Sequence, residues 1–222
     1  TGSNGKTTTK ELISEVLKKK YRIISTIGNL NNHIGVPLTL LRIKSDTEIA
    51  IVEMGANHIK EIKFLTELIN PDFGLITNFG KAHLEGFGSI EGVIKGKSEL
   101  FDFLNKNKKK AFINNDDHIQ NQFNGNKISF GKENKSDYMF KEVKDINYAG
   151  LNYNDLIVNS KLTGNYNYYN IAFATSIGLY FNISIEKIKE AISSYIPSNN
   201  RSQIIEKNNK SIILDAYNAN PT

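Results

Sequence analysis

The chain has 222 residues, of which 39% are hydrophobic, enough to build the core of one large α/β domain or of two small ones. Its net charge of +5, from 28 basic and 23 acidic residues, suits anionic small molecules and is too diffuse for a nucleic-acid footprint. Without cysteine there are no disulfides or thiolate metal sites, which allows a reducing cytoplasm. No apolar run reaches the ~18 residues of a membrane span, and no signal peptide is present. The expected location is the cytoplasm.

The first nine residues, TGSNGKTTT, have the pattern of a phosphate-binding loop that runs into a helix. Gly2 and Gly5 allow backbone N–H groups to turn toward an anion. Lys6 can reach the outer phosphates of a nucleotide, and the Thr7 hydroxyl can bind magnesium. Apolar residues at helical spacing follow within residues 11–19, so the helix dipole would favour phosphate. The motif predicts ATP binding, and an ordinary helix start is the alternative.

A phosphate-binding loop normally follows a buried strand, whereas this sequence begins inside the motif. We therefore expect residues 1–222 to be an excised domain that lacks the strand before the loop. The first glycine of the full motif would then also lie outside the chain.

A strand is expected at residues 21–25, followed by a loop at 26–37 that is rich in Gly and Asn. Its side chains Asn29, Asn31, Asn32 and His33 could line a polar ligand. Asparagine is also common in strained turns, so both interpretations stay open.

The next expected strand, residues 48–53, ends in Glu53. Ligands bind at the carboxyl ends of parallel strands, which makes Glu53 a candidate magnesium ligand. A plain glutamate at a strand end is the alternative.

A helix at 58–69, a strand at 73–77, a helix at 89–104 and a strand at 111–113 continue the alternation. This order predicts an α/β fold with a doubly wound, mostly parallel sheet flanked by helices. His83 lies just past a strand end and is either a site residue or a structural histidine.

Between residues 125 and 161 the pattern changes to short β-like pieces, which predict a small antiparallel subsheet. The pieces are residues 127–130, 138–143 and 155–159. An apolar helix to residue 181, a helix at 185–195 and strands at 203–206 and 211–215 complete the chain. From the local sequence, Asn167 is interpreted as the N-cap of the first of these helices.

Lys97 lies on the apolar stripe of the helix at 89–104, seven residues from both Ile90 and Leu104. An ammonium on a buried face carries a desolvation cost. The alternative is that the long side chain snorkels to the surface.

Five motifs in this chain resemble the central ATP-binding domain of the Mur ligase family, and the resemblance spans essentially all residues. It is most similar to the members that add D-alanyl-D-alanine to a UDP-N-acetylmuramoyl tripeptide. Several other members carry a histidine where this chain has Asn218. The motifs are TGSNGKTT at 1–8, GNLNNHIGVP at 28–37, EMGANH at 53–58, AHLEGFGS at 82–89 and DAYNANP at 215–221.

The resemblance implies a role for each residue that matches a family motif. Lys6, His83 and Lys97 would be catalytic. The phosphates of ATP would bind at Gly2, Ser3, Asn4, Gly5, Lys6, Thr7 and Thr8, with Asn170 and Asn167 at adenine, Arg201 at the phosphates and Asp215 at the ribose. Magnesium would bind at Thr7, Glu53, His83 and Lys97, and the muramoyl peptide near Asn29, Asn31, Asn32 and Asn78.

Lys97 matches a lysine that family members carry as a carbamate. Carbamylation would turn a buried cation into an oxygen ligand suited to magnesium, which would remove the desolvation conflict. The chain departs from the family at Gly96, where alanine is usual, and glycine loosens a helix by about 1 kcal/mol.

The implied reaction is ADP-forming amide synthesis through an acyl phosphate, in the synthesis of peptidoglycan precursors. The implied partners are the UDP-muramoyl tripeptide and D-alanyl-D-alanine, with no nucleic acid, and the protein would be a monomer with further N- and C-terminal domains. Three alternatives are a related Mur ligase, a ligase like folylpolyglutamate synthetase, and a nucleotide-binding domain without catalysis.

Overall fold

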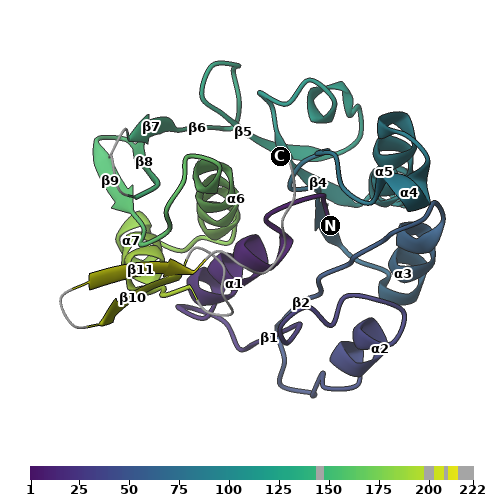
Figure 1. Ribbon diagram of the computed structural model, residues 1–222, viewed down its shortest axis with the longest axis horizontal. Coiled ribbons are helices and arrows are strands. Elements are labelled where there is room, and N and C mark those ends of the chain that lie inside the picture. Colours follow the sequence, from purple (N-terminus) through teal and green to yellow (C-terminus); the bar gives the residue numbers. More distant parts are fainter. Residues whose placement is uncertain (144–147, 198–202, 208–209, 215–222) are drawn as a thin grey trace.

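A computed structural model describes residues 1–143, 148–197, 203–207 and 210–214 (Figure 1). None of the helices within these ranges has the length and apolar character needed to cross a bilayer. In chain order the elements are α1 Lys6–Leu17, β1 Ile23–Ser25, α2 Gly35–Leu40, β2 Ile49–Ile51, α3 Glu61–Ile69, β3 Phe73–Leu75, α4 Leu84–Phe87, α5 Ile90–Lys106, β4 Lys110–Asn114, the 3-10 helix η1 Gln120–Gln122, β5 Lys127–Gly131, β6 Tyr138–Met139, β7 Lys141–Val143, β8 Gly150–Tyr153, β9 Leu156–Asn159, α6 Asn167–Tyr180, α7 Ile185–Ser194, β10 Gln203–Lys207 and β11 Lys210–Leu214.

Strands β3, β4, β5 and β6 form a parallel sheet that is covered by helices on both faces. Alternate residues of β4 enter two different cores. Phe112 packs with the cluster of α1, α6 and α7, whereas Ala111 and Ile113 pack with the cluster of α3 and α5. Figure 1 shows α6 on one side of β4 and α3 and α5 on the other. The predicted α/β fold with a doubly wound, mostly parallel sheet is confirmed.

Strands β7, β8 and β9 form the small antiparallel sheet, and β10 and β11 form an antiparallel hairpin. Two details differ from the sequence analysis. Strands β5 and β6 extend the parallel sheet and do not belong to the antiparallel one. The physical reason is burial, because four successive residues of β5, 128–131, are buried, as in a strand covered on both faces. Strand β8 was not predicted.

Helix α2 lies where the sequence analysis expects the end of a loop. The segment contains Gly35 and Pro37, which commonly mark turns, but Pro37 falls in the first helical turn, where its missing N–H costs nothing. Helix α4 is a single turn within the loop that follows β3.

A cavity of about 400 Å³ lies where β2 and β3 approach each other without being hydrogen-bonded neighbours. The Thr1 nitrogen donates to Leu75 O at 3.0 Å, and Thr77 N donates to Thr1 O at 2.9 Å. Thr1 therefore bonds beside β3 as a residue of a parallel strand does. The space suits one more strand, and the strand before the phosphate-binding loop stays a prediction.

The ring of Phe130 is central to the larger core and supports a prediction about stability. It is 1% exposed, and its centroid lies 4.7 Å from that of Phe173 in a T-shaped contact. We expect Phe130→Ala to lower the free energy of unfolding by about 3–5 kcal/mol. Urea denaturation followed by circular dichroism would measure this.

The matched control for Phe130→Ala is Met139→Ala on the neighbouring strand β6, because Met139 is 43% exposed. A surface substitution of this kind should change stability by less than about 0.5 kcal/mol. Similar losses for the two variants would contradict the placement of Phe130 in the core.

Candidate active site

The loop before α1 has the shape of a phosphate cradle, and close contacts require its two glycines. Gly2 has φ 146° and Gly5 has φ 75°. A Cβ at Gly2 would lie 1.9 Å from Thr77 Oγ1, and a Cβ at Gly5 would lie 2.5 Å from Asn170 Oδ1. Neither position can hold a side chain without movement of its neighbour. The Gly5 conformation leads directly into the N-terminus of α1, where backbone N–H groups favour anions.

Lys6 folds back over this loop. Its Nζ donates to Gly2 O at 3.0 Å and to Ser3 O at 3.2 Å. The ammonium is thus held within the loop, at the place where the outer phosphates of a nucleotide would need a cation.

The segment after β3 binds the phosphate-binding loop through hydrogen bonds of the Asn78 side chain. Asn4 N donates to Asn78 Oδ1, and Asn78 Nδ2 donates to Asn4 O, both at 3.1 Å. Ser3 adds two bonds to the same segment, from its nitrogen to Asn78 O at 3.0 Å and from its Oγ to Gly80 O at 2.7 Å. Asn78 therefore supports the loop, and its predicted contact with the muramoyl peptide stays a prediction.

Glu53 is buried at the end of β2, 4% exposed, and connects two predicted sites. Its Oε1 accepts from Thr7 Oγ1 at 3.2 Å and from Asn31 Nδ2 at 2.7 Å. Its Oε2 is buried and has no hydrogen-bond partner among the described residues. An unpaired buried carboxylate oxygen is costly unless a cation binds it, so Thr7 and Glu53 fit a hard metal ion such as magnesium.

Acidic and histidine side chains do not form a closed metal site in this region. The ranges described contain no group of three or more His, Asp or Glu residues placed to hold a metal ion. A magnesium ion here would need further oxygens from its ligands, as is usual for magnesium bound with nucleotide phosphates.

Lys97 is 1% exposed, which confirms its predicted place on the buried stripe of α5 and excludes the snorkelling alternative. Its Nζ donates to Gly2 O at 3.2 Å and lies 5.4 Å from the centroid of the Phe87 ring. Burial, and then the charge of Lys6, lowers the pKa of Lys97 to about 7. A large fraction of the amine is therefore neutral near neutral pH.

Packing explains Gly96, the departure from the family pattern. A Cβ at this position would lie 2.5 Å from Cε1 of the Phe87 ring. Glycine lets this ring lie close to α5 beside Lys97, so the glycine fits its surroundings.

His83 lies in the loop between β3 and α4 with φ 56°, an uncommon backbone conformation for a residue other than glycine. Burial, and then the charges of Lys6 and Lys97, lower its pKa. The side chain thus favours its neutral form, which can bind a metal or accept a proton.

Asn167 and Asn170 connect α6 to the phosphate-binding loop. Asn170 Oδ1 accepts from Thr9 Oγ1 at 2.9 Å, and Asn170 Nδ2 donates to Asn167 Oδ1 at 2.7 Å. Asn167 Nδ2 donates to Thr163 O at 2.7 Å. The interpretation of Asn167 as an N-cap is wrong, because it is the first helical residue and Tyr166 holds the cap position without a side-chain cap bond.

These elements enclose one cleft of about 1220 Å³. It brings together nearly all the described residues that the sequence analysis selected, from the phosphate-binding loop, the loop after β1, the end of β2, the loop after β3 and the start of α6. Gly2 and Lys97 do not line the cleft, although Gly2 is part of the phosphate-binding loop and Lys97 donates a hydrogen bond to its carbonyl. Arg201 and Asp215 lie outside the described residues.

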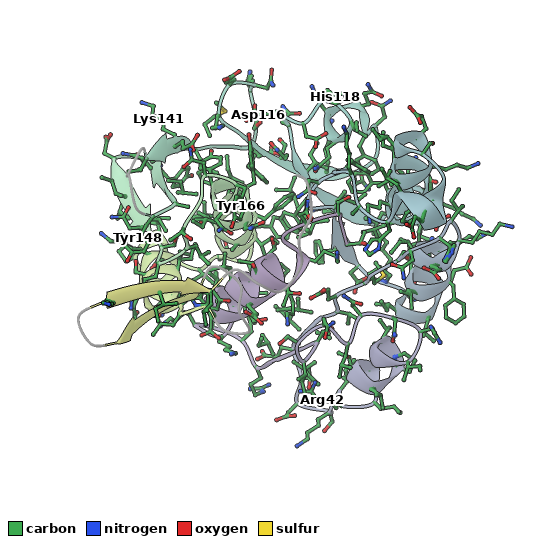
Figure 2. The ribbon with its side chains drawn as sticks, viewed as in Figure 1. Arg42, Asp116, His118, Lys141, Tyr148 and Tyr166 are labelled. Carbon is green, nitrogen blue, oxygen red and sulfur yellow. The ribbon has the colours of Figure 1, made fainter. Side chains whose placement is uncertain are left out.

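The cleft also has lining residues that the sequence analysis did not select. Phe64 on α3, His118 after β4 and Tyr166 before α6 are the clearest examples, and Figure 2 labels the last two. His118 follows the carboxyl end of a parallel strand, so its position on the chain was the signal that could have identified it.

Comparison with known proteins places the chain in a family. Residues 1–178 match the model of the Mur ligase middle domain. The UDP-N-acetylmuramoyl-tripeptide–D-alanyl-D-alanine ligase of Bacillus subtilis is 37% identical over 227 residues, which cover 100% of this chain and 50% of that protein. The chain therefore spans about half the length of the curated relatives it matches.

Solved structures agree with this result. MurF from Acinetobacter baumannii superposes with a TM-score of 0.88 at 30% identity, covering 99% of this chain and 50% of that one. MurF ligase from Thermotoga maritima, solved in complex with ADP, gives a TM-score of 0.83 at 30% identity over 99% of this chain and 53% of that one. The sequence match, the fold and the cleft agree: the chain belongs to the Mur ligase family.

Proposed function

We propose that this chain is the ATP-binding part of a ligase that joins D-alanyl-D-alanine to a UDP-N-acetylmuramoyl tripeptide and forms ADP. The observation that carries the proposal is the convergence of Lys6, the Thr7–Glu53 pair and Lys97 on one phosphate cradle. The relatives named above as ligases of this dipeptide support the choice of substrates.

The cradle residues would bind and orient ATP. Backbone N–H groups at the start of α1 would face the phosphates, and the Lys6 ammonium would leave the carbonyls of Gly2 and Ser3 for the outer phosphate oxygens. Thr7, Glu53 and His83 would hold magnesium, which supplies charge neutralisation during phosphoryl transfer. Asn167 and Asn170 would lie at the adenine, with Arg201 and Asp215 at the phosphates and ribose.

Two displacements account for the reaction. A carboxylate oxygen of the tripeptide attacks the γ-phosphorus, and the bond between this phosphorus and the β-phosphate oxygen breaks. ADP departs, and the tripeptide carries an acyl phosphate. The neutral amine of the dipeptide then attacks the acyl carbon, phosphate departs, and the amine loses a proton as the amide forms. The main task of the chain would be to hold the anionic ATP and the substrate carboxylate together. Lys6 and Arg201 would offset their negative charge. His83, with its lowered pKa, would keep a neutral imidazole beside them.

The carbamylated form of Lys97 is part of this proposal. A buried amine with a pKa of about 7 has a substantial neutral fraction, and only a neutral amine adds to carbon dioxide. The carbamate would offer oxygen atoms for a second magnesium ion. The carbamate would keep one N–H on Nζ, which could still donate to Gly2 O.

The peptide contacts, the cellular location, the oligomeric state and the further domains are also part of the proposal. Asn29, Asn31, Asn32 and Asn78 would face the muramoyl peptide. The protein would act in the cytoplasm as a monomer, with further domains that bind the UDP group and close on the nucleotide.

An assay of ADP release tests the proposed function. The full-length protein, given ATP, magnesium and the UDP-muramoyl tripeptide, should release ADP in proportion to added D-alanyl-D-alanine. Release that requires a free amino acid instead would favour another Mur ligase activity, and release that requires a folate would favour the synthetase alternative. Nucleotide binding without any release would favour a domain without catalysis.

Lys6→Ala should weaken ATP binding by at least about tenfold, because a charge-assisted bond to the outer phosphates is lost. Isothermal titration calorimetry would measure this change. Lys18→Ala is the matched control, since Lys18 follows the same helix and pairs with Glu15 on the surface. Unchanged affinity in Lys6→Ala would argue against the phosphate-cradle assignment.

Lys97→Ala should reduce turnover much more than ATP affinity, and short carboxylic acids should partly restore turnover by filling the vacated space. Steady-state assays with and without added acetate would show both effects. Lys95→Ala, an exposed lysine on the same helix, is the control and should keep normal turnover. Near-normal turnover in Lys97→Ala would exclude the carbamate.

A further inference from the structure

A second buried lysine, Lys10, lies one helical turn after Lys6 on α1. It is 5% exposed, and its Nζ donates to Thr26 O at 2.8 Å and to Gly28 O at 3.1 Å. It also lies near Glu11 on the same helix, with 3.7 Å between Nζ and Oε1. The shortest of these contacts are to two backbone carbonyls, and both carbonyls belong to the loop after β1.

Residues 26–33, here named the 26–33 loop, carry the asparagines that face the cleft. Their far end is tied to the segment after β2, because Asn31 Nδ2 donates to Glu53 Oε1 at 2.7 Å and Gly55 N donates to Asn31 O at 2.8 Å. Their near end is tied by several hydrogen bonds of Thr26. Thr26 N donates to Ile51 O at 3.0 Å, Thr26 Oγ1 accepts from Glu53 N at 2.9 Å, and Thr26 O accepts from Lys10.

Lys10 links α1 to the start of this loop through its side chain, and its charge makes the link strong. Burying an ammonium is costly unless hydrogen bonds compensate it, and two carbonyls within bonding distance provide that compensation. At Gly28 the backbone has φ 54°, a conformation that glycine adopts without strain. Lys10 therefore secures the chain at the turn that aims Asn29 and Asn31.

We propose that Lys10 is a positioning residue that sets the 26–33 loop in register with the phosphate-binding loop. Lys6 and Thr7 precede it on the same helix, so the distance between the nucleotide cradle and the loop is fixed by one rigid element. The assignment of the loop to the muramoyl peptide rests on the proposed function, but the link between helix and loop does not.

Lys20, in the turn that follows the C-terminal end of α1, offers a matched control. Its Nζ also donates to two carbonyls, Phe181 O at 3.1 Å and Asn182 O at 3.2 Å. Lys20 is exposed, however, and neither carbonyl belongs to the cleft. A lysine-to-methionine change removes the same type of contact at each site.

The first measurement is hydrogen exchange in the full-length protein, read by mass spectrometry. Lys10→Met should speed exchange in peptides that cover the 26–33 loop, while the phosphate-binding loop and α6 stay near the wild-type rate. Lys20→Met should leave the 26–33 loop unchanged. Unchanged exchange in Lys10→Met, or faster exchange throughout the protein, would overturn the proposal.

The second measurement separates the two substrates. In Lys10→Met, KM for the UDP-muramoyl tripeptide should rise about tenfold, while KM for ATP stays within about twofold. Equal rises in both constants would mean that Lys10 supports the nucleotide site or the whole fold, and the proposal would be wrong. If Lys10→Met does not fold, Lys10→Gln, which keeps an N–H donor on a shorter side chain, is expected to show the same split in smaller measure.

The two hypotheses fail separately in these experiments. A wild-type protein that ligates nothing would remove the proposed function, and the exchange comparison between Lys10→Met and Lys20→Met would still decide the role of Lys10. If Lys10→Met and Lys20→Met both ligate normally, with the KM values of the wild type, only the proposed role of Lys10 would be refuted.

Discussion

Two lysine side chains share one acceptor, the carbonyl oxygen of Gly2, and the site depends on this arrangement. Lys6 is the first residue of α1 and Lys97 belongs to α5, and their Nζ atoms lie 3.0 and 3.2 Å from that oxygen. Two like charges so close together disfavour one another, which contributes to the lowered pKa of Lys97. An anion in the cradle would relieve this repulsion, so the loop is electrostatically prepared for phosphate.

The loop that carries this acceptor is held from several sides. Thr77 leaves no room for a side chain at Gly2, Asn78 bonds both backbone groups of Asn4, and Asn170 fills the space beside Gly5. These contacts come from the ends of a strand and a helix, which are rigid supports. A cradle held in this way needs little rearrangement when a ligand binds, and a preorganised site loses less free energy on binding.

The sequence predicted the parts of the site that follow from local pattern. The glycines and Lys6 of the cradle were recognisable from residue type and spacing, and the apolar stripe of α5 correctly placed Lys97 in the interior. The carboxyl end of β2 correctly placed Glu53 at the cleft. In each case a short stretch of sequence contains the physical cause.

Pairings between distant segments were not predictable in the same way. Nothing near Asn78 indicates that its amide bonds the backbone of Asn4, and nothing near Asn170 indicates Thr9 as its partner. The parallel pairing of β5 with β4 depends on which faces the helices cover, which the local sequence of short strands does not state. Arg201 and Asp215, predicted from the resemblance alone, stay predictions.

The hydrogen bond between Thr9 and Asn170 joins residues 161 positions apart. Closing so long a loop costs entropy, and contacts of this range slow folding. During synthesis the cradle leaves the ribosome well before α6, the helix that supports it. The nucleotide site therefore takes its final shape only after α6, a much later segment of the chain, has been synthesised and has packed against the cradle.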